Sequence, residues 1–564
     1  MFSRQASGFF RRLRFASRLA SAGASCNNSN TSLFCENNLR FTSRHKQNLT
    51  LWIILFGQAG IIFGTNSNFA MAESVSVDRT GNQNDTGEAY LSGLRKVEDG
   101  SIISNEHTSK WRIFTDNGRD LFQKGKLDEA ERYFLSALQE AKEGFGERDP
   151  HVASACNNLA EIYRVRKSFD KAEPLYLEAI NILEESFGPG DIRVGAALHN
   201  LGQFYLGQRK LEEAQACYER ALKIKGRVLG HGHSDYANTM YHLGTVLNLL
   251  GKEKDSEALI QDSIRILEEC GLGESVTCIR RMRYLSQILL RSNRLLEAEN
   301  VQRKILHVLE LSKGWESLDT IVAAESLALT LQSIGNLTEA RELLERCLEV
   351  RKKILREDDI QVGANMLHLA RVARLNSNQV RKRNISEANI ELDKAKHLLD
   401  NSIRIAWKIL DNLRSNISES QISGEVHAAL IILLQSIDAL GLVEITKHEW
   451  QEPKEATATP REGGLALSQL LSIFKEPGIR RAILKSPELK AEYVSCLKHL
   501  MNLFSEGNSE EIHKLQEEIK HLEADPSPAL PVHLLQYIET SHGFAGLNGS
   551  LAVANHRQVL LNLH

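Results

Sequence analysis

The sequence predicts an all-α fold, a right-handed α-solenoid of about seven helix pairs of 42 residues each, plus a C-terminal helical region. Two observations lead to this prediction. Apolar residues follow a helical period along most of the chain, as in Leu159, Ile162 and Tyr163. Small residues recur every 42 positions, and stacked helix pairs with such a period wind into a superhelix. The recurring small residues are Gly118, Ala160, Gly202, Gly244, Ser286, Ala328 and Ala370.

Each of the first six units contains another small residue 12 positions after the first, and most contain a third one 19 positions after the first, as in Ala172 and Ala179 of the second unit. At this spacing the first helix of a pair, helix A, can approach the second, helix B, because no large side chain separates them. We therefore interpret these residues as packing positions and not as binding sites. After Ala370 the next small residue is Ala395, so a 13-residue insertion is expected there, as a loop or as a lengthened helix.

The links between units repeat as well. Residues 146–153 (GERDPHVA) recur as 188–195 (GPGDIRVG) and 230–237 (GHGHSDYA), where Gly or Pro ends one helix and Asp or Ser is expected to cap the next. With residues 172–179 (AEPLYLEA), these features resemble tetratricopeptide repeats. A standard unit has about 34 residues, and the 42-residue unit resembles that of kinesin light chains and their relatives. The resemblance spans roughly 110–410 and implies a scaffold that binds other proteins.

A peptide-binding groove is expected along the A helices. With the recurring small residue as position eight, positions two, five, six, nine, twelve and thirteen should line it. Kinesin light chains have Asn at position six, which implies that Asn158 and Asn200 bond the backbone of an extended partner segment. The candidate groove residues are Asn157, Asn158, Glu161, Arg164, His199, Asn200, Gln203, Tyr241, His242 and Arg283.

The N-terminal region has the composition of a targeting sequence. Residues 1–48 hold eight Lys or Arg and one acid, which predicts a transit peptide. Residues 49–72 carry no charge, and their apolar core at 49–64 is shorter than the roughly 20 residues of a comfortable membrane span. They are expected to be a membrane anchor or a second sorting signal cleaved after Ala72, and 73–108 a flexible linker. A mitochondrion is the expected location, a chloroplast the alternative, and the cytoplasm less favoured.

Charge and motifs exclude several classes of function. From residue 73 onward the chain has 61 basic and 71 acidic residues, which does not suit nucleic-acid binding. The eight cysteines form no C-x-x-C pair. His231 and His233 lie in a link between units, without the further ligands of a metal site. We therefore predict no catalytic residue, no metal and no cofactor, so the protein is not expected to be an enzyme.

Residues 110–414 are expected to form the repeat solenoid, and 415–564 a helical cap or a separate module. The predicted function is a scaffold or assembly factor in an organelle that binds partner peptide segments. The alternative is a cytosolic cargo adaptor like a kinesin light chain, although residues 73–108 lack the heptads of that family's coiled coil.

Overall fold

The structure is a computed structural model, and it describes residues 106–413, 424–450, 471, 474, 477–503 and 509–524. The predicted transit peptide at 1–48, the uncharged segment at 49–72 and all but the end of the predicted linker at 73–108 lie outside the described residues. The elements within the described ranges are α-helices. The all-α prediction is therefore confirmed.

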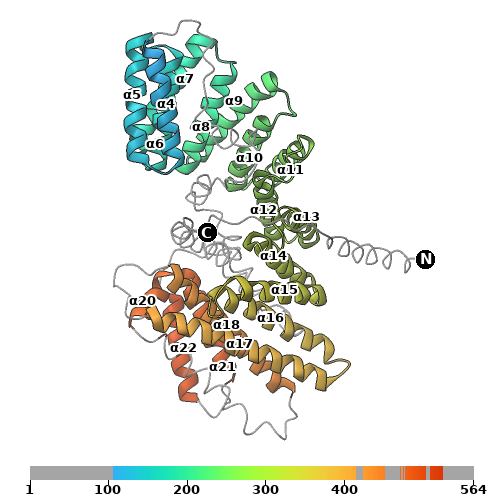
Figure 1. Cartoon of the computed structure of the whole chain (residues 1–564). Helices are drawn as coiled ribbons and strands as arrows, with labels where there is room; N and C mark the ends of the chain where they lie inside the picture. Colours follow the sequence, from blue (N-terminus) through green and yellow to red (C-terminus); the bar gives the residue numbers. More distant parts are fainter. Residues whose placement is uncertain are drawn as a thin grey trace, which may run out of the picture. The chain divides into compact units, whose positions relative to one another are not determined.

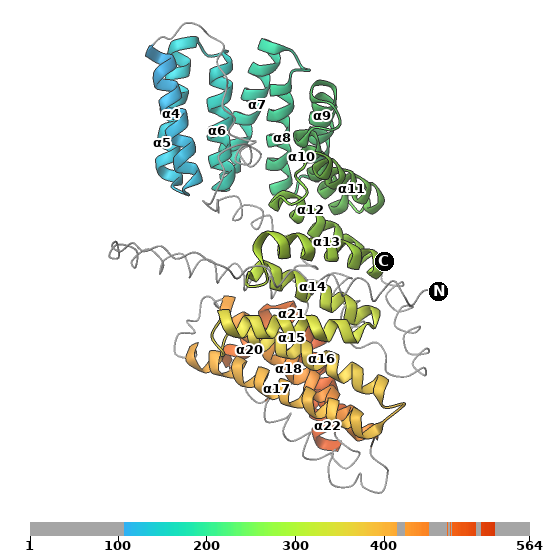
Figure 2. The ribbon, with the colours of Figure 1, turned by 45° about the vertical axis from the view of Figure 1, so that its right-hand side comes forward.

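Seven consecutive helix pairs make up residues 106–413. Each helix packs against the next one along the chain (Figures 1 and 2). The pairs are α4 (Glu106–Gln123) with α5 (Leu127–Phe145), α6 (Pro150–Val165) with α7 (Phe169–Phe187), α8 (Ile192–Gly207) with α9 (Leu211–Leu229), α10 (Ser234–Leu249) with α11 (Glu253–Glu269), α12 (Val276–Arg291) with α13 (Leu295–Lys313), α14 (Leu318–Ile334) with α15 (Leu337–Ile354), and α16 (Ile360–Val380) with α17 (Ile385–Leu413). The even-numbered helices are the A helices, and the odd-numbered ones are the B helices.

The recurring small residues lie where helix A meets helix B. A Cβ atom added to Gly202 would lie 2.9 Å from Cε1 of Tyr218, and one added to Gly118 would lie 2.7 Å from Cδ1 of Phe134. The aromatic rings of Tyr218 and Phe134 are fully buried and fill the space that the missing side chain leaves. The predicted packing role of these positions is confirmed.

Side chains in five of the six links cap the following A helix, whereas Ser317 before α14 makes no such bond. Oδ1 of Asp149 accepts a hydrogen bond of 2.8 Å from the backbone N–H of His151, and Asp191 caps α8 in the same way. At α10 the cap is His233, whose Nδ1 accepts from the backbone N–H of Asp235 at 3.0 Å. The expectation that Asp or Ser caps each helix was therefore wrong at this link, because a neutral imidazole nitrogen accepts the same bond.

The 13-residue insertion lengthens helices. Helix α16 has 21 residues and α17 has 29, whereas the earlier helices have 16 to 19. The longer α17 packs against α18 (Gly424–Trp450), and two ion pairs join them. These pairs are Lys396 with Glu444 at 2.8 Å and Lys447 with Asp393 at 2.7 Å. The insertion thus extends the surface on which the C-terminal region packs.

The C-terminal region continues the fold with α18, α20 (Pro477–Lys485), α21 (Pro487–Leu503) and α22 (Ser509–Ala524). Helix α18 packs against α16, α17 and α21. Its segment Gly424–Lys447 is long and apolar enough to cross a membrane, but 83% of its most apolar window is buried within the protein. Helix α18 is therefore the core helix of this region.

Candidate functional site

The predicted groove residues lie on four successive A helices. Asn157, Asn158, Glu161 and Arg164 are on α6, His199, Asn200 and Gln203 on α8, Tyr241 and His242 on α10, and Arg283 on α12. Their exposure differs. Asn158, Glu161, His199 and Asn200 are buried, and the other six are partly buried. We call the side of α6, α8, α10 and α12 that carries these residues the A-helix face.

Side chains at positions five and six connect neighbouring A helices. In each case position five of one A helix contacts position six of the next, 43 residues later. The contacts are a hydrogen bond of 3.1 Å between Asn157 and Asn200, an edge-to-face contact of the His199 and His242 rings at 5.1 Å, and one of the Tyr241 and Tyr284 rings at 5.9 Å. The structure thus brings most of the predicted residues together, but as contacts between repeats.

Glu161 is held by two partners within its own unit. Arg164 donates from Nη2 to Oε2 of Glu161 at 2.6 Å, and the hydroxyl of Tyr176 donates to Oε1 at 2.5 Å. Burial, reinforced by the negative charge of Glu161, raises the pKa of Tyr176 well above its usual value, so this hydroxyl keeps its proton. Glu161 and Arg164 therefore neutralise each other at the A-helix face.

His199 lies at the centre of a buried hydrogen-bonded group. Nε2 of Gln203 donates to Nε2 of His199 at 3.0 Å, and Nδ1 of His199 lies 3.0 Å from Oγ1 of Thr239. Because the Gln203 amide is the donor, Nδ1 of His199 carries the proton and donates to Thr239. Lys225 also donates to this oxygen at 2.9 Å, and the Thr239 hydroxyl donates to the carbonyl of Asp235 at 3.2 Å. This arrangement fixes the side chain of Gln203 on the face.

His242 is an uncharged aromatic group in this setting. Its ring stacks on Tyr218 with 5.8 Å between centroids and an angle of 12° between planes. Burial, and after it the positive charges of Arg281 and Arg280, lower the pKa of His242 to about 3. The imidazole therefore stays neutral at physiological pH and contributes ring packing.

Asn158 is almost fully buried, and within the described part of the chain its Nδ2 has no hydrogen-bond partner. The same is true of Oγ1 of Thr115, which occupies position five of α4, 43 residues before Asn158. Because Nδ2 of Asn158 is enclosed by protein, a ligand reaches it only if its surroundings move.

Helix α12 makes the A-helix face basic. It carries four arginines and no acidic residue. Arg281 is buried, donates from Nη1 to the carbonyl of Ser263 at 3.1 Å and lies over the ring of Tyr241 at 5.4 Å. Arg283 is only partly buried, and among the described residues it has no hydrogen bond or ion pair. Its guanidinium is therefore available at the surface.

Sequence reasoning did not select Thr239, Lys225, Tyr218, Tyr284 or Arg281 as part of this group. Tyr218 lies on helix B, which the groove positions leave out. Tyr284 stands at position six of α12 and fits the prediction by its register. A search for side chains 43 residues apart would have found it.

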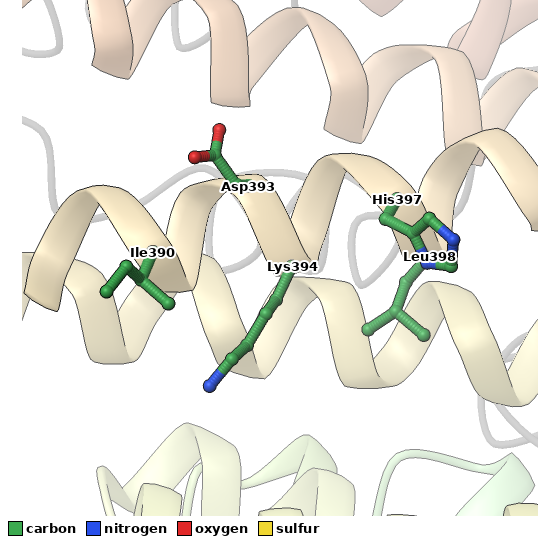
Figure 3. A pocket seen from close by; sticks show the side chains of 5 residues that line it. All are labelled: Ile390, Asp393, Lys394, His397 and Leu398. Atoms are coloured by element: carbon green, nitrogen blue, oxygen red, sulfur yellow. The ribbon is translucent and has the colours of Figure 1, made fainter.

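A shallow pocket lies on helix B of the last pair, away from the A-helix face. Ile390, Asp393, Lys394, His397 and Leu398 line it, and all five come from α17 (Figure 3). Ion pairs already engage Asp393 with Lys447 and Lys394 with Glu391. Because one helix surface provides all the lining, the pocket does not bring together groups for chemistry.

Four cysteines of the repeats have raised pKa values. Burial raises the pKa of Cys156 and Cys347 to about 12, and that of Cys217 and Cys278 to about 11. At neutral pH these thiols are protonated and behave as small apolar groups.

Two family models identify the repeats. Residues 112–185 and 193–269 match one model described as a tetratricopeptide repeat, and residues 320–360 match a second model with the same description. No curated protein matches the chain.

Three solved structures are similar to parts of the chain. The nearly identical TPR-like repeats assigned to a kinesin light chain of Podosopora anserina share 18% identity, with a TM-score of 0.34, over 37% of this chain and 99% of that one. The apo quorum sensor NprR of B. thuringiensis shares 14% identity, with a TM-score of 0.36, over 71% of this chain and 98% of that one. Apo RapI shares 12% identity, with a TM-score of 0.35, over 52% of this chain and 98% of that one. From the family models and the helix pairs together, we conclude that this chain carries tetratricopeptide repeats arranged as an α-solenoid.

Proposed function

We propose that this protein is a non-enzymatic scaffold or assembly factor that binds segments of partner proteins along its A-helix face. Repeat solenoids use such extended faces for binding. The observation that carries the proposal is the row of contacts between positions five and six on α6, α8, α10 and α12. These contacts hold the A helices and their polar side chains in place before a partner arrives, which lowers the entropy cost of binding.

Two groups on this face suit recognition of a peptide. Nε2 of Gln203 is engaged by His199, which leaves its carbonyl oxygen to accept a backbone N–H of a partner. Arg283 offers several N–H donors to carbonyl or carboxylate oxygens. Both side chains are partly accessible, whereas Asn158 and Asn200 are buried at 1% and 3% exposure. We therefore propose Gln203 and Arg283 as first contacts of the partner.

We also propose that the protein works in an organelle, a mitochondrion before a chloroplast. The support is the basic, acid-poor segment at 1–48 and the uncharged segment at 49–72 that follows it. The segment 49–64 would then hold the protein at a membrane or be removed with the presequence. A cytosolic adaptor is the alternative.

A photo-reactive amino acid placed at position 203 of the full-length protein, in living cells, tests the binding face. Position 223 serves as the control, because Lys223 is exposed on helix B of the same pair. We expect cross-links to defined segments of a few proteins from position 203 and not from 223. Cross-links that are equal from both positions, or absent from 203, would contradict the proposal.

Arg283→Ala then tests the contribution of the charge. It should lower the yield of the cross-links from position 203 several-fold, whereas Lys223→Ala, which removes a surface charge from helix B, should leave the yield unchanged. Equal losses would indicate a general charge effect and not a binding site.

Imaging a C-terminal fluorescent fusion, with and without residues 1–72, tests the location. The full-length fusion should be in an organelle and the truncated one in the cytosol. A cytosolic signal from the full-length fusion would leave the adaptor as the better hypothesis.

A further inference from the structure

Helix α21 packs on the core helix α18, and a buried thiol marks the contact. Sγ of Cys496 on α21 donates to the carbonyl of Leu434 on α18 at 3.2 Å. Cys496 is 0% exposed, and the apolar side chains of Leu497 and Leu500 beside it are also buried. A reagent reaches this sulfur only when α21 separates from α18.

Acidic and neutral polar side chains also join the two helices. Nε2 of Gln435 on α18 donates to Oε1 of Glu492 on α21 at 2.9 Å. Nδ1 of His499 on α21 lies 2.8 Å from Oδ1 of Asp438 on α18. Asp438 is 5% exposed, so the contact encloses a carboxylate together with apolar side chains.

Positive charges reach this contact from the last repeat. Arg371 and Arg374 on α16 occupy positions nine and twelve of that A helix, and their charges act on Glu492 and on Asp438 respectively. Helix α18 packs against α16, and the charges of α16 act on carboxyl groups of both α18 and α21. Among the described residues, Glu488 and Cys496 on α21 also interact with Glu492, and His427 on α18 lies 3.8 Å from Glu488.

We propose that the contact between α18 and α21 is a proton-sensitive latch, which holds α21 on the core helix α18 when closed and releases it when open. In the closed contact Glu492 is bonded to Gln435, which lies one helical turn before Asp438 on α18, so the latch is stable while one of the two carboxylates keeps a proton. When both ionise, their repulsion and the loss of their hydration favour separation. The proposal does not depend on what the A-helix face binds.

The direction of the pH effect follows from Glu492. Burial, and then the charge of Asp438, raise the pKa of Glu492 to about 7, against an ordinary value of 4.5, while Arg371 and Gln435 oppose the rise. A carboxyl whose pKa is raised in the closed state stabilises that state fully below its ordinary pKa. This stabilisation is lost as the pH rises through 7. Between pH 6 and pH 8 the fraction of open latch should therefore rise about tenfold.

Thiol labelling of the full-length protein measures the opening. We would treat it with N-ethylmaleimide at pH 6 and pH 8 and quantify Cys496 and Cys347 by mass spectrometry. Cys347 is also 0% exposed but lies on α15 within the repeats, so the ratio of the two labels cancels the pH dependence of the thiol reaction and any global unfolding. The ratio of Cys496 to Cys347 labelling should rise about tenfold from pH 6 to pH 8.

Three variants decide the assignment. In Glu492→Gln the ratio should rise much less than in the wild type, and in Glu511→Gln, which changes an exposed carboxylate on α22, it should rise as in the wild type. Asp438→Asn should show a smaller rise, because Glu492 then loses its acidic neighbour. A wild-type ratio that does not change, or an equal rise in Glu492→Gln, would overturn the proposal. If Glu492→Gln does not fold, a rise in Asp438→Asn equal to that of the wild type would overturn the proposal.

Discussion

Asn200 on α8 donates a hydrogen bond of 3.1 Å from Nδ2 to Oδ1 of Asn157 on α6. The two residues are 43 positions apart, one more than the repeat length, because position six of one unit meets position five of the unit before it. Asn200 is 3% exposed, so the bond is shielded from water. Residues expected to bind a partner therefore also determine how two repeats stack.

Asn200→Ala should weaken the junction between the second and third units. The variant loses the hydrogen bond to Asn157, at a cost of about 0.5–1.5 kcal/mol. Native-state hydrogen exchange should show faster exchange in α6 and α8. The control is Asn181→Ala, an exposed position on α7. If both variants exchange alike, the bond does not stabilise the junction.

Two glycines of α8 should respond in opposite directions to Ala. Gly202→Ala places a methyl group 2.9 Å from the buried ring of Tyr218, which should lower the free energy of unfolding by about 1–3 kcal/mol. Gly207 has nothing within 4 Å of an added Cβ, so Gly207→Ala should be neutral or stabilising by up to about 1 kcal/mol. Urea denaturation measures both, and a loss of stability in Gly207→Ala equal to that in Gly202→Ala would rule out the packing explanation.

Glu325→Gln should destabilise the sixth pair strongly. Both carboxylate oxygens of Glu325 accept from Arg351 at 2.7 Å, and Arg351 is 0% exposed. The variant leaves a buried guanidinium without its counter-charge, at a cost of about 3–5 kcal/mol. The exposed carboxylate of Glu345 on α15 offers a matched control, Glu345→Gln, whose midpoint in urea should stay near that of the wild type.

The Glu325→Gln effect should depend on pH. Burial disfavours the ionised form of Glu325, but the charge and hydrogen bonds of Arg351 outweigh it and lower the pKa. The ion pair therefore stabilises the fold fully above the ordinary pKa of 4.5, and this contribution is lost as the pH falls through the lowered value. The difference between wild type and variant should shrink on acidification, and a constant difference would contradict this assignment.

His242 should make the repeats sensitive to acid. Burial and nearby cations lower its pKa to about 3, from an ordinary 6.5, so between these values only the unfolded chain binds the proton. Stability is then lost as the pH falls below 6.5, by up to about 1.4 kcal/mol per pH unit. His242→Gln should flatten this dependence, as measured by urea denaturation from pH 7 to pH 4. A slope identical to that of the wild type would show that His242 is not the titrating group.

The repeat period predicts the backbone of this protein better than its side-chain contacts. Gly202 and its equivalents reveal where helices approach, because only a small residue allows that distance. The pair of Asp438 and His499 has no such signal, since the two residues are 61 positions apart in a region without a period. His233 as a helix cap was also missed, because imidazole is an uncommon acceptor at that position.

The sequence predicts which helix positions carry the candidate site, but it does not predict how far their side chains are exposed to solvent. The positions named from the sequence do lie on successive A helices. Whether such a residue faces solvent or its neighbour depends on the side chain 43 positions away, and a pattern read within one unit does not include that residue. Asn157 and Asn200 show this most directly.

The contacts at positions five and six join like with like: Asn157 with Asn200, His199 with His242, and Tyr241 with Tyr284. Each junction therefore has its own chemical identity. Excising the third unit of 42 residues would keep the helical register. It would bring Asn157 of the second unit opposite His242 of the fourth, so an amide would meet an aromatic ring. The units of this array are thus not interchangeable, and their order along the chain is itself specified by the side chains.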